Sequence, residues 1–246
     1  MKTINDLLSR LKQIIPTGTK PKFTRGEDLL AWNQEEGLLN SSVIVRENKA
    51  MKMQRIMCRS GIRELHINCS FDNYNIENEG QRKAVSLARQ YSIEFDGSIA
   101  SFVFSGRPGT GKNHLAAAIG NDLILRGKSV LIVTVADLMS SMKATFNETS
   151  EITEEQLIKN LSNVDLLIID EIGIQSESRY EKMIINQIID RRSSSKKPTG
   201  MLSNLDHNSM NILLGERVMD RMRLGKSMWI YFDWESYRSR IQGNEY

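Results

Sequence analysis

The chain contains a glycine-rich loop that limits its possible folds more than any other feature. The loop consists of the residues Gly106-Arg107-Pro108-Gly109-Thr110-Gly111-Lys112-Asn113, between a predicted strand at 101–104 and a predicted helix at 113–126. The glycines allow successive backbone N–H groups to surround a phosphate, and the helix that follows points its positive end at the same anion. The segment therefore predicts a P-loop that binds ATP at the end of a buried strand.

Within this loop, Lys112 and Asn113 have the most specific expected roles. Lys112 is expected to neutralise oxygens of the β- and γ-phosphates. Asn113 replaces the Ser or Thr that usually contacts magnesium, and its amide oxygen can still bind Mg²⁺ directly or through water. We also expect nucleotide contacts from the other loop residues and the next one, namely Gly106, Arg107, Pro108, Gly109, Thr110, Gly111 and His114.

A second motif, Leu-Leu-Ile-Ile-Asp-Glu at 166–171, predicts a buried strand that ends in two acids. Such an ending can be a simple strand-to-loop boundary, but here it follows a P-loop with another predicted strand between them. We therefore assign Asp170 to the Mg²⁺ ion and Glu171 to the attacking water. A glutamate beside the metal-binding aspartate favours ATP hydrolysis over phosphate transfer to a bound small molecule.

Polar residues further along the chain complete the predicted ATPase site. Asn204 follows a predicted strand at 199–203, where its amide can orient water beside the γ-phosphate; a turn cap is the alternative. Arg217 and Arg221 share one face of a predicted helix at 209–223. We predict that Arg221 reaches the γ-phosphate held by a neighbouring subunit, which makes hydrolysis depend on assembly. Two arginines that interact favourably with the helix dipole are the alternative.

Strands and helices alternate from about residue 71 onward, which is the pattern of a parallel sheet covered by helices on both faces. The runs at 130–133 and 166–169 are continuously apolar, as in strands buried on both sides. The predicted fold class is therefore α/β. The expected strands are 101–104, 129–135, 165–169, 199–203 and 228–232, and the expected helices are 81–95, 113–126, 137–146, 154–161, 179–192 and 209–223.

Residues 1–62 predict a small helical domain that precedes the ATPase domain at 63–246. Apolar residues at helical spacing, among them Leu7 and Leu11, indicate a first helix. Leu29 and Trp32 lie in a predicted second helix. These helices form either an ordinary subdomain or a docking module for a partner, since tryptophan and leucine are side chains that interfaces bury.

Basic residues are concentrated between positions 43 and 63, where Glu47 is the single acid, although the net charge of the chain is only +3. This stripe is either a solvated helix face or a contact for nucleic acid or an acidic partner.

The chain shows no sign of export or membrane insertion. No apolar run approaches the ~18 residues of a membrane span, and we find no signal peptide, so a cytoplasmic protein without a membrane partner is expected. Two cysteines, Cys58 and Cys69, fit a reducing compartment. A zinc site that combines them with His66 lacks a fourth ligand, so ordinary packed thiols are favoured.

The order of these motifs resembles that of AAA+ ATPases, and longer segments resemble the DnaC/IstB-like family among them. The segments that carry the resemblance are SFDNY, GRPGTGKNHLAAAI, SVLIVTVADLM, NVDLLIIDEIG and GERVMDRMRLG, and the resemblance extends over essentially the full length, including the short helical N-terminus. The resemblance implies a five-stranded parallel sheet with the P-loop strand internal, a small helical N-terminal domain and no C-terminal lid. It also implies ATP and Mg²⁺ as cofactors.

The resemblance further implies roles for individual residues. Asn204 resembles a residue that senses the γ-phosphate, Arg221 resembles an arginine finger, and Arg238 resembles a second arginine that senses the nucleotide. The helices expected at 137–146 and 154–161 resemble an insertion found in initiators and helicase loaders. In that setting Phe146 is expected to stack on single-stranded DNA, or alternatively to pack in the core. The other residues expected at the DNA are Ser178, Arg179 and Tyr180.

The family resemblance predicts an ATP-dependent loader of the hexameric replicative helicase onto single-stranded DNA, in replication initiation and restart. The ATPase domains then associate with one another and hydrolyse ATP slowly. The residues expected to bind the helicase are Leu7, Leu11, Leu29 and Trp32. A transposition helper ATPase that binds duplex DNA and a transposase is the alternative.

Overall fold

The computed structural model describes residues 27–28, 30–34, 66–96, 100–147, 150–174 and 178–237. The chain divides into two units, Met1–Ile44 and Val45–Tyr246. In the first unit, residues 27–28 and 30–34 are helical, in agreement with the predicted second helix. Leu7, Leu11, Leu29, the basic stripe at 43–63 and the predicted domain boundary at 62/63 lie outside the described residues.

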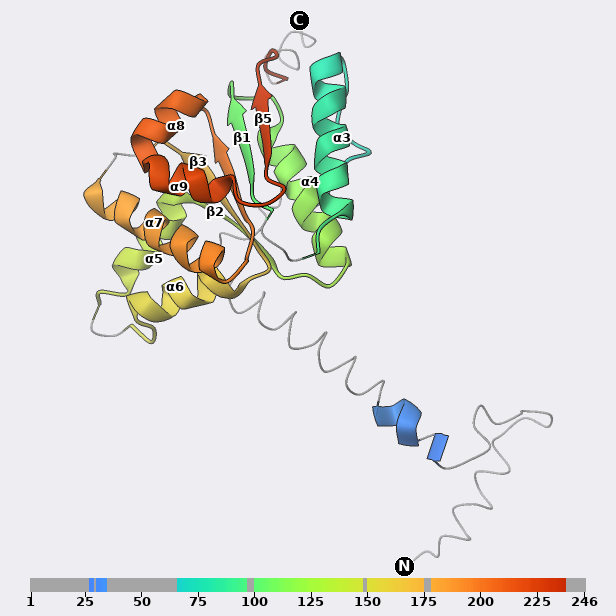
Figure 1. Cartoon of the computed structure of the whole chain (residues 1–246), viewed down its shortest axis with the longest axis vertical. Helices are drawn as coiled ribbons and strands as arrows, with labels where there is room; N and C mark the ends of the chain where they lie inside the picture. Colours follow the sequence, from blue (N-terminus) through green and yellow to red (C-terminus); the bar gives the residue numbers. More distant parts are fainter. Residues whose placement is uncertain are drawn as a thin grey trace, which may run out of the picture. The chain divides into compact units, whose positions relative to one another are not determined.

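Five parallel strands form the sheet of the second unit (Figure 1). They are β1 (Phe102–Gly106), β2 (Val130–Thr134), β3 (Leu166–Ile172), β4 (Thr199–Ser203) and β5 (Met228–Phe232). Their order is β2-β3-β4-β1-β5, and every neighbouring pair is parallel. All five predicted strands are therefore confirmed, and the P-loop strand is internal. Because parallel strands end at the same edge, residues that follow β1, β3 and β4 meet there.

Helices cover both faces of this sheet (Figure 1). On one face lie α3 (Glu79–Ile93) and α4 (Lys112–Leu125); on the other lie α5 (Val135–Ala144), α6 (Glu154–Asn163), α7 (Arg179–Ser194), α8 (His207–Leu214) and α9 (Glu216–Met222). Alternate residues of β1 point to opposite faces, so Val103 joins one buried cluster while Phe102 and Phe104 join the other. The internal strand is thereby fixed from both sides.

Local side-chain hydrogen bonds determine where most of these helices begin. A polar side chain accepts a hydrogen bond from a backbone N–H group in the first turn of α3, α5, α6, α7 and α8. The capping residues are Asn78, Thr134, Thr153, Ser178 and Asp206. By contrast, α4 begins after Gly111 with no side-chain cap, so its first N–H groups are left for another acceptor.

The helix predicted at 209–223 is wrong as a single element, because the structure divides it into α8 and α9. The break lies at Gly215, whose φ of 85° and ψ of 155° belong to a region that essentially only glycine adopts. A Cβ atom at this position would meet nothing within 4 Å, so the backbone conformation and not the available space requires glycine.

A fully buried arginine, Arg192, joins the amino-terminal ends of two strands to the end of a helix. Its guanidinium donates to backbone carbonyl groups at the end of α6, before β3 and before β4, and its Nε donates to the hydroxyl of Thr199 at 3.0 Å. The carbonyl acceptors are those of Leu161, Ser162, Val164, Asp165 and Pro198. Burial lowers the pKa of Arg192 to about 9, although the nearby Tyr91 and Asp165 act in the opposite direction. The backbone carbonyls thus take the place of a direct carboxylate partner.

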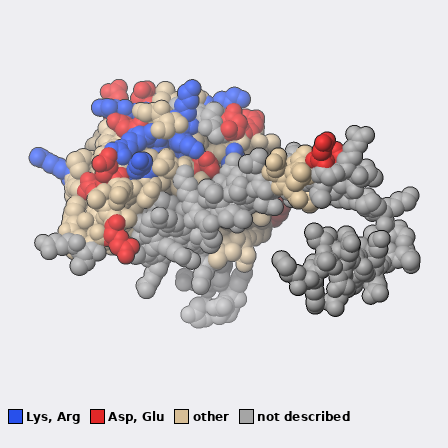
Figure 2. Space-filling model, turned by 90° about the horizontal axis from the view of Figure 1, so that it is seen from below, with Lys and Arg blue, Asp and Glu red and all other residues tan. Residues whose placement is uncertain are grey.

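Acidic and basic side chains are mixed on the face of the second unit shown in Figure 2. Ion pairs such as Arg126–Asp122 at 3.0 Å and Lys197–Asp165 at 2.8 Å connect opposite charges on the described surface. None of the described helices combines the length and the apolar character that a bilayer crossing requires.

Candidate nucleotide-binding site

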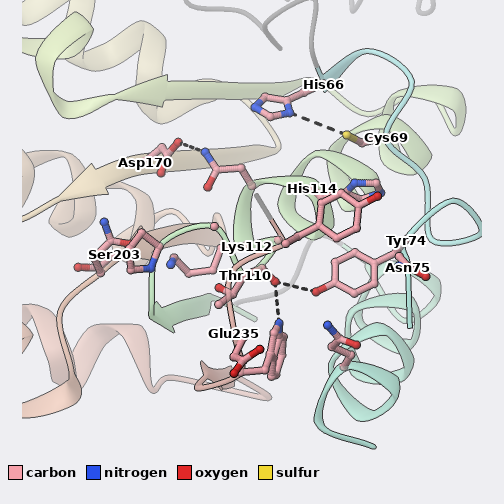
Figure 3. Close-up of a pocket in the computed structure, with 18 of the residues that line it drawn as sticks. His66, Cys69, Tyr74, Asn75, Thr110, Lys112, His114, Asp170, Ser203 and Glu235 are labelled. Atoms are coloured by element: carbon pink, nitrogen blue, oxygen red, sulfur yellow. Dashed lines mark hydrogen bonds between the residues drawn. The ribbon is translucent and has the colours of Figure 1, made fainter. Parts of the chain in front are cut away.

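The predicted ATPase residues converge on a cleft of about 570 Å³ at the edge where β1, β3 and β4 end (Figure 3). The predicted residues in its lining are Pro108, Gly109, Thr110, Gly111, Lys112, Asn113, His114, Asp170, Glu171 and Asn204. Gly106 and Arg107 do not line the cleft, and their carbonyl groups instead accept hydrogen bonds from Lys112. Most of the predicted nucleotide site is thus brought together in one place.

Lys112 is held inside the glycine-rich loop in this structure. Its Nζ donates to the carbonyl oxygens of Gly106 at 2.8 Å and Arg107 at 2.6 Å, and the residue is only 6% exposed. Burial lowers the pKa of Lys112 to about 8, although the charge of Asp170 acts in the opposite direction. The two hydrogen-bond partners of this ammonium group are neutral carbonyls, so a phosphate in the cleft would add a negatively charged partner.

The start of the loop is packed against the last strand. The backbone N–H of Arg107 donates to the carbonyl oxygen of Phe232 at 2.9 Å. Gly106 has a φ of 118°, and a Cβ atom there would lie 2.3 Å from the same oxygen. Glycine is required at this position because the backbone of β5 comes so close.

A β-bulge places both predicted acids at the cleft. The register of β3 against β4 shifts between Ile169 and Ile172, and Glu171 has a φ of 61°. Consecutive residues of a regular strand point to opposite faces, whereas a bulge redirects a side chain. Asp170 and Glu171 can therefore both line the cleft. The sequence predicted the two acids but not the bulge that orients them.

The residues around Asp170 fit a magnesium ion. Its Oδ2 accepts a hydrogen bond from Nδ2 of Asn113 at 2.6 Å, and its Oδ1 accepts one from the backbone N–H of Glu171 at 2.7 Å. Mg²⁺ is usually held by one or two carboxylates together with phosphates and water. The described residues contain no group of three His, Cys, Asp or Glu that could hold a metal alone, so phosphate and water would complete the coordination.

Residues 66–74, to which sequence reasoning gave no role in nucleotide binding, are hydrogen-bonded to α4 beside the cleft. Nδ2 of Asn121 contacts the carbonyl oxygens of His66, Ile67 and Cys69 at 2.8–3.1 Å. Nε2 of His114 lies 3.0 Å from the carbonyl oxygen of Ser70. His114 was predicted to contact nucleotide, and here it also holds this segment in place. Of the zinc ligands considered, Nδ1 of His66 and Sγ of Cys69 lie 3.8 Å apart, while Cys58 is outside the described residues.

The two arginines of α9 share one carboxylate. Arg217 and Arg221 both form ion pairs with Asp190 of α7, the former at 2.9 Å. The side chain of Arg221, the predicted finger, is 20% exposed, whereas that of Arg217 is 73% exposed. Neither lines the cleft of its own chain. Arg238, the other predicted nucleotide-sensing arginine, lies outside the described residues.

The residues predicted to contact DNA lie apart from the cleft lining. Phe146 is 62% exposed, so the alternative that it packs in the core is wrong for this unit. Its ring centre lies 6.0 Å from that of Tyr180, whose hydroxyl donates to Glu154 at 2.7 Å. Ser178 caps α7 and Arg179 is exposed. The rings of Phe146 and Tyr180 are thus neighbours near the start of α7, and their contact with DNA stays a prediction.

Comparison with known proteins shows which family the chain matches. The family model "IstB-like ATP binding protein" matches residues 24–243. The replicative helicase loader DnaC of Buchnera aphidicola subsp. Schizaphis graminum is 68% identical over 242 residues, which is 98% of each chain. The replicative helicase loader DnaC of Escherichia coli (strain K12) is 65% identical over 246 residues and covers both chains fully.

Solved structures agree with the fold. A crystal structure of the DnaC helicase loader matches with a TM-score of 0.61 and 23% identity, over 69% of this chain and 99% of that chain. DnaI matches with a TM-score of 0.58 and 24% identity, over 70% and 92% of the two chains. From the family match and the full-length relatives together, we conclude that the chain belongs to the IstB-like ATP-binding family, among the DnaC-type replicative helicase loaders.

Proposed function

We propose that this protein is an ATP-dependent loader that places the hexameric replicative helicase on single-stranded DNA during replication initiation and restart. The observation that carries the proposal is the 65–68% identity, over essentially the whole chain, to proteins named replicative helicase loaders. The cleft that contains a P-loop and two acids supports the ATP-dependent part.

The polar residues predicted for the cleft each have a chemical task in ATP hydrolysis under this proposal. Lys112 and the loop amides bind the phosphates, and Mg²⁺ would neutralise phosphate charge while held by Asp170 and Asn113. Glu171 polarises the attacking water, and Asn204 orients that water toward the γ-phosphate. Glu171→Gln is then expected to bind ATP and to hydrolyse it poorly, which a comparison of nucleotide binding with phosphate release would test.

Self-association supplies the remaining catalytic charge in this proposal. Arg221 of one subunit stabilises the γ-phosphate bound to its neighbour, after it leaves the ion pair with Asp190. Mixing Arg221→Ala with Glu171→Gln subunits tests the arrangement. The Arg221→Ala subunit keeps an intact cleft, and the Glu171→Gln subunit keeps an intact arginine finger. ATPase activity should recover in the assembled mixture and not in either variant alone. Normal hydrolysis by assembled Arg221→Ala would contradict a trans-acting finger, and Arg217→Ala is the matched control.

Contact with single-stranded DNA is proposed at the Phe146–Tyr180 ring pair. Exposed aromatic rings hold single strands by base stacking, without a requirement for a particular sequence. The exposure of Phe146 and its proximity to Tyr180 support this assignment, and Ser178 and Arg179 are adjacent along the chain.

Docking on the helicase is proposed for the first unit, through Leu7, Leu11, Leu29 and Trp32. The test is mass photometry of the full-length protein mixed with the host helicase, with and without ATP and a short single strand. A helicase hexamer that gains several copies of this chain supports the proposal, and Trp32→Ala with Leu29→Ala should abolish the gain. Leu125→Ala, which removes an 86% exposed side chain from the ATPase unit, is the control.

The alternative, a transposition helper ATPase, is not favoured, because the full-length relatives at 65–68% identity carry the loader name. If no helicase complex forms under any nucleotide condition, the loader proposal is wrong, and binding to duplex DNA and a transposase becomes the next test.

A further inference from the structure

Two aromatic side chains that line the cleft donate hydrogen bonds to one carbonyl group of the glycine-rich loop. Figure 3 labels one of them, Tyr74, and the residue with that carbonyl group, Thr110. The carbonyl oxygen of Thr110 accepts a hydrogen bond from the hydroxyl of Tyr74 at 2.8 Å and another from the indole Nε1–H of Trp234 at 2.9 Å. Tyr74 precedes α3, whereas Trp234 follows β5. The two donors therefore come from opposite ends of the described ATPase unit.

The next carbonyl along the loop is fixed in a similar way. The backbone N–H of Tyr237 donates to the carbonyl oxygen of Gly109 at 2.9 Å. Residues after β5 thus contact two consecutive carbonyl groups of the loop, those of Gly109 and Thr110.

The planarity of the peptide bond connects these contacts at a carbonyl group to the N–H group of the next residue. In a trans peptide, the C=O of one residue and the N–H of the next point in opposite directions. Two donors on the Thr110 carbonyl use both acceptor positions of that oxygen and so fix the peptide plane. The N–H of Gly111 then points the other way, and backbone N–H groups of this loop type are the groups that cradle phosphates.

The packing around these contacts is tight enough to preserve the orientation. Gly111 has a φ of 93°, and a Cβ atom there would lie 2.6 Å from the Tyr74 ring. The Trp234 ring lies 4.8 Å from that of Phe232, centre to centre. Burial raises the pKa of Tyr74 to about 12, so the hydroxyl keeps its proton and remains a donor at neutral pH.

We propose that Tyr74 and Trp234 are positioning residues, whose hydrogen bonds to the Thr110 carbonyl orient the Gly111 amide toward the phosphates of the bound nucleotide. The inference rests on the nucleotide site proposed above. Neither residue touches the phosphates in this role, because each acts through the loop backbone.

The test compares ligands with and without phosphates on the full-length protein. ADP and adenosine are titrated as competitors of a fluorescent ADP analogue bound to wild type and to Tyr74→Phe, which keeps the ring and loses the hydroxyl. Loss of one hydrogen bond should weaken ADP binding about threefold to tenfold. Adenosine affinity should stay the same, because adenosine has no phosphate for the loop to bind. Trp234→Phe should show the same selective loss.

A matched control is available in the same unit. Tyr91 is as buried as Tyr74, and its hydroxyl donates to the carbonyl oxygen of Ala100 at 2.6 Å, outside the loop. Tyr91→Phe should leave the affinities for ADP and adenosine unchanged.

The possible failures are distinguishable. Wild-type affinity for ADP in both Tyr74→Phe and Trp234→Phe would overturn the positioning role alone. Equal weakening of ADP and adenosine would also overturn it, since that result indicates general damage to the cleft. Failure of the wild-type protein to bind ADP at all would overturn the nucleotide site itself and the positioning role with it.

Discussion

Replacing Arg192 by methionine removes a guanidinium that is bonded to five backbone carbonyls and one hydroxyl. A buried carbonyl left without a donor costs about 1–3 kcal/mol. Against this loss, the folded state no longer has to bury a charge, and a pKa lowered to about 9 corresponds to roughly 5 kcal/mol of that burial cost. At about 2 kcal/mol each, the five carbonyls cost about 10 kcal/mol. We therefore expect a net loss on the order of 5 kcal/mol in the free energy of unfolding, a large part of the ~5–15 kcal/mol of a typical domain.

Urea denaturation of the wild type, Arg192→Met and Arg192→Lys measures this loss. Lysine keeps the charge but has three donors on a single nitrogen, so its effect should be intermediate. Arg191→Met is the control, because the Arg191 side chain is 36% exposed and lies 3.7 Å from Glu155, and a surface pair of this kind contributes about 0–1 kcal/mol. A loss below about 1 kcal/mol in Arg192→Met, or equal to that of the control, would refute the reasoning from unsatisfied carbonyls.

Four other predictions follow from the structure. Burial lowers the pKa of Lys112 to about 8, and a bound phosphate favours its charged form, so ADP binding near pH 8 should be accompanied by proton uptake that becomes smaller at lower pH. Calorimetry in buffers of different ionisation enthalpy measures the uptake, and Lys112→Arg should abolish it. Burial raises the pKa of Asp165, but hydrogen bonds, chiefly from Lys197, lower it overall to about 2. The contribution of this carboxylate to stability is therefore complete above about pH 4 and is lost as the pH falls toward 2. Asp165→Asn should remove this part of the acid dependence of urea unfolding, and an unchanged profile would contradict the assignment. Gly215→Ala should destabilise the protein by roughly 1–3 kcal/mol through its backbone conformation alone, and the midpoint of urea unfolding measures this loss. Phe146→Ala should weaken the binding of single-stranded DNA, measured by fluorescence anisotropy, and should leave the melting temperature unchanged.

The parts of the fold that the sequence predicts well are those with local signals. The glycine-rich loop and the apolar run before Asp170 each contain their own pattern, so the strands, their parallel arrangement and most of the cleft lining could be anticipated. The bulge at Glu171 could not, because it depends on how β3 pairs with β4. The break at Gly215 was missed since a glycine is tolerated within a helical pattern, and only its dihedral angles reveal the end of α8.

Contacts between distant segments account for the rest. Tyr74 and Trp234 bond to a loop residue 36 and 124 positions away, and no periodicity in the sequence reports such a pair. The ion pair between Asp190 and Arg221 likewise joins two helices, so the sequence predicts the arginine but not its partner in the isolated chain. For Phe146, sequence reasoning left stacking and core packing open, and the exposure of the ring decided against the core.

The position of β5 has a consequence for the order in which the protein becomes competent during synthesis. This strand is made last of the five, yet it pairs with β1, and the residues at its end and just after it hold the glycine-rich loop. During synthesis the glycine-rich loop is therefore made long before the residues of β5 and after it that form hydrogen bonds with it. We expect ribosome-bound chains that stop before β5 to lack tight ADP binding. Nucleotide then cannot assist the early folding steps and binds tightly only to the completed unit.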